Sequence, residues 1–142
     1  MAVKGIEHIA VAVSSLDAGI KAWTAMGFTC SHVEVVADQQ VKVARMVVGQ
    51  FCIELLEPTS ADSPVAKFIE KRGPGLHHVC LETDQVGADL NALKGAGFAL
   101  IDAAPRLGAH GCSIAFVHPR ATGGVLVELS QPPDVDAPHQ GG

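Results

Sequence analysis

Hydrophobic and polar residues alternate along several short segments of the chain, and each of these segments predicts a β-strand. In the first, 6–13, bulky aliphatic residues alternate with His8 and two alanines. Segments of the same kind, rich in β-branched residues and bounded by turn residues, predict further strands over 29–36, 41–48, 51–57, 76–83, 98–102, 112–118 and 124–130.

Helix signals separate the strands, and helices are expected over 16–26, 64 to about 71, and 86–96. Gly27 is a common C-terminal stop for the first helix, and Pro64 fits the first position of the second. Apart from the helix at 64, each half has the order strand, helix, three strands. The Gly-Pro-Gly at 73–75 divides the halves.

The two halves also repeat in sequence, and the repeat carries a histidine. Residues 7–13 match 77–83, and 51–55 resemble 125–129. Successive side chains of a strand point to opposite faces of the sheet. In these four strands the bulky aliphatic residues therefore share one face, which would pack against helices, and the repeated polar residues share the other. One histidine and one glutamate from each half therefore face a shared concavity, whose wall includes the small residues Ala10, Ala12 and Cys80.

Two imidazoles and two carboxylates suit a hard or borderline divalent metal ion, and on an octahedral ion they leave two positions for a substrate. We therefore expect a metal site formed by His8, Glu54, His78 and Glu128. Cys52 and Cys80 share this face but are expected only to fill space. Ordinary surface or core roles are expected for the other strand residues, His32, His77, His110, His139, Glu34 and Glu82; His118 either hydrogen-bonds within a loop or borders the site.

Composition excludes several classes of protein. The 142 residues, 48% hydrophobic and 18% charged, predict one globular domain with a sizeable core. A net charge of −5 without a basic block argues against nucleic-acid binding. No apolar run approaches the ~20 residues of a membrane span, and the N-terminus does not resemble a signal peptide. Four cysteines without a CxxC pair are typical of reduced thiols in a cytoplasmic protein.

Several longer motifs are more specific than any single histidine. They are IELLEP (53–58), DSPVAKF (62–68), GLHH (75–78), PRLGAHG (105–111), FVHP (116–119) and GGVLVEL (123–129). With them the chain resembles the vicinal oxygen chelate superfamily of glyoxalases and extradiol dioxygenases. Within it, the resemblance is closer to the methylmalonyl-CoA epimerase family and covers the chain to Gln131.

The resemblance implies an α+β fold in which two tandem βαβββ modules form a cupped mixed sheet around a metal site. The expected domain is a single vicinal oxygen chelate domain over 1–131, with modules at about 1–72 and 75–131. The proline-rich tail, 132–142, is expected to be disordered. Homodimers are common in the superfamily, and we expect one here.

The implied activity is metal-dependent interconversion of the C2 epimers of methylmalonyl-CoA, an acyl-CoA substrate, through a chelated enolate. The cation would be Co²⁺ or Mn²⁺, held at the positions of His8, His78 and Glu128, with Glu54 at the fourth ligand position. Glu128 is the first candidate for the catalytic base and Glu54 the second. Some family members carry a further glutamate, proposed as a base, where this chain has Val43.

Two alternatives remain open at the level of the sequence. A glyoxalase I-type lactoylglutathione lyase would use the same four ligands, so that only the substrate pocket separates it from an epimerase. A metal-free small-molecule binding module of the superfamily usually lacks the ligand quartet, which this chain retains. An extradiol dioxygenase would be expected to use a three-ligand iron site.

Overall fold

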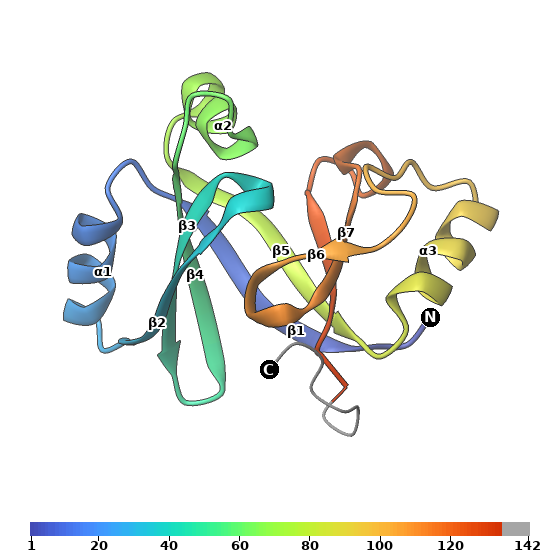
Figure 1. Cartoon of the computed structure of the whole chain (residues 1–142), viewed down its shortest axis with the longest axis horizontal. Helices are drawn as coiled ribbons and strands as arrows, with labels where there is room; N and C mark the ends of the chain where they lie inside the picture. The colour runs from blue at the N-terminus through green and yellow to red at the C-terminus, as the bar shows by residue number, and fades with distance from the viewer. Residues whose placement is uncertain (135–142) are drawn as a thin grey trace.

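A curled eight-stranded mixed sheet forms the centre of the molecule, with helices α1 and α3 at opposite ends and α2 above it (Figure 1). The computed structural model describes residues 1–134. The strands are β1 Val3–Ala12, β2 Thr29–Val36, β3 Val41–Val48, β4 Phe51–Pro58, β5 Gly75–Thr83, β6 Arg106–Leu107, β7 Ser113–Val117 and β8 Val127–Gln131. The α-helices are α1 Leu16–Ala25, α2 Pro64–Arg72 and α3 Val86–Gly95, and the short 3-10 turns are η1 Ala37–Gln39, η2 Ala109–Gly111 and η3 Pro119–Ala121.

The strand order in the sheet is β2-β3-β4-β1-β5-β8-β7-β6, so both halves contribute to one sheet. β1 and β5, the copies of one strand in the repeat, pair antiparallel at its centre. Each also pairs in parallel with the last strand of its own half, β1 with β4 and β5 with β8. The predicted α+β class and cupped mixed sheet are confirmed. No helix within residues 1–134 has the length and apolarity needed to cross a membrane.

The register of the four central strands places the repeated polar residues in two neighbouring rows. Residues directly opposite each other on paired strands share a face of the sheet. The pairing aligns one row as His8–Cys80–Glu128 and the other as Glu54–Ala10–His78. The face predicted from strand parity is therefore the face that carries all four candidate ligands.

The opposite face of the sheet packs against α1 and α3. In the first half Val11 and Leu55 lie under α1, where they contact a cluster that includes Trp23. In the second half Leu129 lies under α3 and packs with Leu90. The predicted separation of an aliphatic face from a polar face is confirmed in both halves.

Helix α2 covers part of the concave face, which corrects one expectation. Ala10 and Ala12 are fully buried in a cluster that contains Val65 of α2, and Phe68 and Ile69 of the same helix pack against this cluster. The small side chains on β1 thus make room for a helix, so Ala10 and Ala12 line a filled part of the concavity and not, as expected, its open wall. The open part of the concavity lies farther along the strands.

The second half departs from the predicted strands after α3. The segment 98–102 forms only an isolated bridge, Leu100 to Val117, and β6 lies instead at 106–107. The carboxylate of Asp102 explains the difference, because it accepts the backbone N–H of Phe116 at 2.8 Å in place of a strand carbonyl. β8 begins at Val127 rather than 124. Of the predicted disordered tail, 135–142 lies outside the described residues.

Asp89 ties α3 to β5 and to the residue that precedes β1, and its removal is expected to destabilise the fold. Its buried carboxylate accepts the backbone N–H of Ala2 at 3.0 Å and the hydroxyl of Thr83, which is fully buried. Asp89→Ala leaves these donors without an acceptor, so we expect a loss of about 1–3 kcal/mol in the free energy of unfolding, measured by urea denaturation. The control is Asp84→Ala, which removes only an exposed pair with Lys4. Equal losses in both variants would contradict this role.

Candidate metal centre

The four predicted ligands line a single pocket on the concave face of the sheet. His8, Glu54, His78 and Glu128 are each only 5–7% exposed and are the polar centre of this pocket. Val43 is part of the wall. Buried polar groups are costly unless each finds a partner, so the contacts of these four side chains decide what the pocket can hold.

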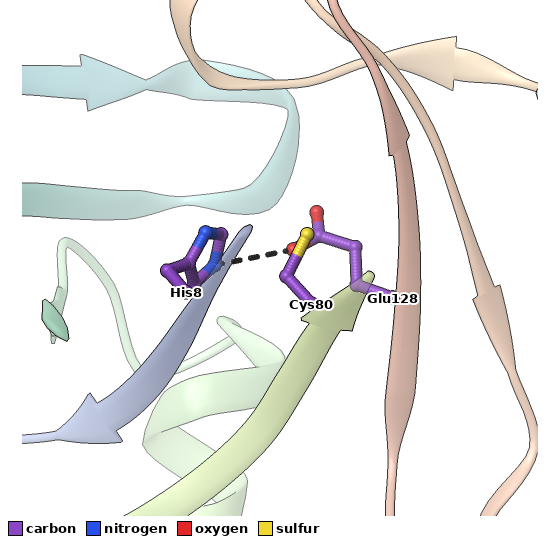
Figure 2. A group of neighbouring side chains, drawn as sticks. All are labelled: His8, Cys80 and Glu128. Carbon is purple, nitrogen blue, oxygen red and sulfur yellow. Dashed lines mark ion pairs between the residues drawn. The ribbon is translucent and has the colours of Figure 1, made fainter. Parts of the chain in front are cut away.

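His8 lies between the two glutamates. Its Nδ1 donates a hydrogen bond to Glu7 Oε1 at 2.9 Å, while its Nε2 lies 3.3 Å from Glu54 Oε1 and 3.5 Å from Glu128 Oε1. Figure 2 shows the imidazole facing Glu128, with Cys80 beside them. The buried Nε2 makes no hydrogen bond. With the proton on Nδ1, Nε2 presents a lone pair to two carboxylates, an arrangement that a bound cation would stabilise.

The pKa values of His8 and Glu128 also indicate that the pocket favours a positive charge. Burial lowers the pKa of His8, but the carboxylates of Glu128, Glu7 and Glu54 outweigh it and raise the pKa to about 10. Burial raises the pKa of Glu128, yet the hydrogen bond with His78 and the nearby charge of His8 hold it well below its usual range. In the absence of a metal ion, a proton on His8 supplies the positive charge that these carboxylates require.

Glu54 differs from Glu128 because it has a permanent cationic partner. The guanidinium of Arg45 donates from Nη1 to Glu54 Oε2 at 3.0 Å and to Glu7 Oε1 at 2.9 Å, and from Nη2 to Glu7 Oε2 at 2.8 Å. Burial raises the pKa of Glu7, but hydrogen bonds from His8 and Arg45 lower it to about 2. Arg45 thus holds Glu54 directly and His8 through Glu7.

Sequence reasoning missed this supporting pair. From the sequence alone, Arg45 is one of several cationic residues expected to be solvated surface charges or contacts for CoA phosphates. Its register opposite Glu54 on the paired strands β3 and β4 was the available signal, together with the acidic residue that directly precedes His8. A carboxylate that holds the second nitrogen of a histidine ligand is a common device in metal sites, because it fixes the tautomer and the ring orientation.

His78 is oriented by the residue that precedes it, His77. Its Nε2 lies 3.0 Å from Glu128 Oε1 and its Nδ1 lies 2.8 Å from Nδ1 of His77. Ala10 pairs with His78 and Val11 with Leu76, so His77 is the extra residue of a β-bulge. Alternation fails at this bulge, and the expectation of an ordinary role is wrong for His77, whose ring contacts a predicted ligand. Burial lowers its pKa to about 4, so the ring stays neutral.

Three other sequence expectations have clear outcomes. His118 accepts the backbone N–H of Arg120 at 3.0 Å, so its role within a loop is confirmed. His110 was expected to be an ordinary surface residue, but it lines the pocket, with Nε2 4.0 Å from Glu54 Oε2. Glu34 was expected to be solvated and instead pairs with His110. His139 lies outside the described residues.

The chain is similar to known proteins over most of its length. A family model described as the glyoxalase/bleomycin resistance protein/dioxygenase superfamily matches residues 7–116. A mouse protein named methylmalonyl-CoA epimerase, mitochondrial, is 36% identical over 89% of this chain and 72% of its own. The Bacillus subtilis protein YqjC, which is uncharacterized, is 44% identical over 89% of this chain and 91% of its own.

Solved structures give the same result. A variant of Streptomyces coelicolor methylmalonyl-CoA epimerase in complex with 2-nitronate-propionyl-CoA superposes with a TM-score of 0.90 at 35% identity, covering 96% of this chain and 100% of that chain. A methylmalonyl-CoA epimerase in complex with methylmalonyl-CoA and NH4+ matches with the same TM-score, identity and coverage. The chain therefore belongs to the glyoxalase/bleomycin resistance protein/dioxygenase superfamily, and its relatives there include methylmalonyl-CoA epimerases.

Proposed function

We propose that this protein is a metal-dependent epimerase that interconverts the C2 epimers of methylmalonyl-CoA through an enolate. Relatives at 34–36% identity are named methylmalonyl-CoA epimerase, and five of the matching solved structures hold methylmalonyl-CoA or 2-nitronate-propionyl-CoA. The observation that carries the metal dependence is the buried Nε2 of His8, which has no hydrogen-bond partner and faces two carboxylates.

Three donor pairs of the quartet have the spacing of neighbouring ligands on one divalent ion. Nitrogen and oxygen ligands bind such ions at about 2.0–2.2 Å, so neighbouring ligands on one ion lie about 3–3.5 Å apart. The contacts in the pocket have this spacing: His8 to Glu54 is 3.3 Å, His8 to Glu128 is 3.5 Å, and His78 to Glu128 is 3.0 Å. The set of two nitrogens and two carboxylates supports Co²⁺ or Mn²⁺ as the cofactor.

When bound, such an ion supplies Lewis acidity next to the acidic C–H of the substrate. The protein side chains set the positions of the proton acceptors. Glu128 is ionised, and no arginine or lysine among the described residues pairs with it, so it is our first candidate for removal of the α-proton. Glu54 is the second candidate, and its Oε2 is already engaged by Arg45.

Epimerisation also requires a proton to return to the opposite face of the enolate. Val43 lines the pocket at the position where some family members carry a glutamate, and an isopropyl group cannot transfer a proton. Glu54 and Glu128 come from different halves of the chain, on β4 and β8, with His8 between them. We infer that these two carboxylates serve the two faces of the substrate.

Exchange with deuterated water tests the reaction. Incubation of one epimer of methylmalonyl-CoA with the metal-loaded protein is expected to introduce deuterium at C2, because the α-proton must leave and return in each turnover; mass spectrometry of the acyl-CoA measures it. His118→Ala, outside the pocket, serves as the control and should exchange at the wild-type rate. Absence of exchange together with turnover of a glutathione hemithioacetal would favour the lyase. Binding without any turnover would favour a binding module.

A further inference from the structure

A second cluster of metal-binding side chains lies at the edge of the pocket and takes no part in the proposed reaction. His32 and Glu34 are two residues apart on β2, so they share a face of this edge strand. His110 reaches them from η2, in the other half of the chain. All three side chains are between a quarter and a half exposed, in contrast to the buried quartet.

The three donors are already arranged around one point. Glu34 Oε1 lies 3.1 Å from His110 Nδ1 and 3.6 Å from His32 Nε2, and all three donor atoms lie within 4.8 Å of one another. The two imidazole rings are 4.8 Å apart between centroids. Neighbouring ligands on one ion at about 2.0–2.2 Å would have nearly the same separations, about 3–3.5 Å.

The backbone at His110 supports this placement. His110 has φ +58°, a left-handed conformation that is uncommon for a residue with a side chain, and its N–H donates to Glu34 Oε1 at 2.9 Å. The same oxygen therefore fixes both the backbone and the ring of His110. The turn thus holds the imidazole over β2, with Nδ1 toward Glu34 and Nε2 toward Glu54.

We propose that His32, Glu34 and His110 form a second divalent-cation site at the mouth of the pocket, separate from the quartet. Two imidazoles and one carboxylate with open positions for water are a ligand set that suits Zn²⁺ and Ni²⁺. An ion there would join β2 of the first half to η2 of the second. It would add to the ion pair of Arg106 with Asp38, at 3.0 Å, which links segments next to these two. Its occupancy would hold the 109–111 turn, which borders the pocket, against β2.

Zinc titration of the metal-free full-length protein tests this site by calorimetry. Wild type is expected to bind two ions, and His78→Ala, which disrupts the quartet, is expected to bind one. His32→Ala should lower the affinity of that remaining site by at least about tenfold, because one of three ligands is lost. The double variant His32→Ala/His78→Ala should bind no zinc over the same range of zinc concentration. His118→Ala serves as the matched surface histidine and should behave as wild type.

Hydrogen exchange gives a second readout that does not depend on any activity. Zinc should slow amide exchange at 109–112 in His78→Ala and leave it unchanged in the double variant. Equal zinc binding by His78→Ala and by the double variant would overturn the second site. A different result would contradict the quartet. Wild type and His78→Ala would then bind the same number of zinc ions, while His32→Ala would bind one fewer.

Discussion

Replacement of His78 with alanine is expected to remove the divalent ion from the buried quartet. The epimerisation rate should fall by about two to three orders of magnitude, which is roughly the effect of losing one key electrostatic contact in an active site. His78 is 6% exposed, and its Nε2 lies 3.0 Å from Glu128 Oε1. The alanine variant loses a nitrogen donor and leaves a buried carboxylate without that partner. His8→Ala is expected to have the same consequence, because Nε2 of His8 faces both glutamates.

Metal analysis is the direct measurement. Protein loaded with Co²⁺ or Mn²⁺ and freed of excess ion should retain about one tightly held ion per chain, and both alanine variants should retain almost none. Circular dichroism and a melting curve show whether each variant is folded, and His118→Ala provides a histidine substitution away from the pocket. A folded His78→Ala protein that kept its ion and its rate would remove the quartet from the proposal.

The second large effect is expected from a comparison of the two glutamates, which are equivalent in the repeat but differ in their surroundings. Glu128→Gln should slow epimerisation by about 10²–10⁴-fold, the usual contribution of a general base, because an amide cannot accept the α-proton. Glu54→Gln should cost less, toward the 10²-fold end of that range, because Glu54 serves one face of the substrate but its Oε2 is already engaged by Arg45. Its amide oxygen can still act as a ligand, and Arg45 keeps its two hydrogen bonds to Glu7.

Both glutamine variants need a metal measurement beside the rate, so that loss of the ion is separated from loss of the base. Deuterium incorporation from each epimer should also be followed separately, because a carboxylate that serves one face affects exchange from one epimer more than from the other. If Glu54→Gln proved as slow as Glu128→Gln with its ion retained, the inferred difference between the glutamates would be wrong.

Strand parity could predict the quartet because the four strands that carry it are regular and pair side by side. Alternation then sets the face of each side chain, and the repeat supplies the same parity twice. This reasoning fails where the backbone departs from alternation. The bulge at His77 turns that ring toward His78, and the left-handed turn at His110 brings its ring to the pocket edge.

Contacts between distant segments were the other part that local patterns could not predict. Arg45 and Glu7 are 38 positions apart and meet only because β3, β4 and β1 lie in order across the sheet. The role of α2 is similar, since its amphipathic pattern does not say which face of the sheet it covers. The homodimer, the single-domain boundaries and the cytoplasmic location stay predictions, and the mouse relative is named as mitochondrial.

The antiparallel pairing of β1 with β5 at the middle of the sheet has a consequence for fragments of this protein. Each half of the chain holds one histidine and one glutamate of the quartet, so neither half alone presents a complete ligand set. Two separately produced halves would need to associate along this strand pair before they could hold a metal ion tightly. Added metal would then act as the thermodynamic link that favours their reassembly, and the ion would report on complementation between the fragments.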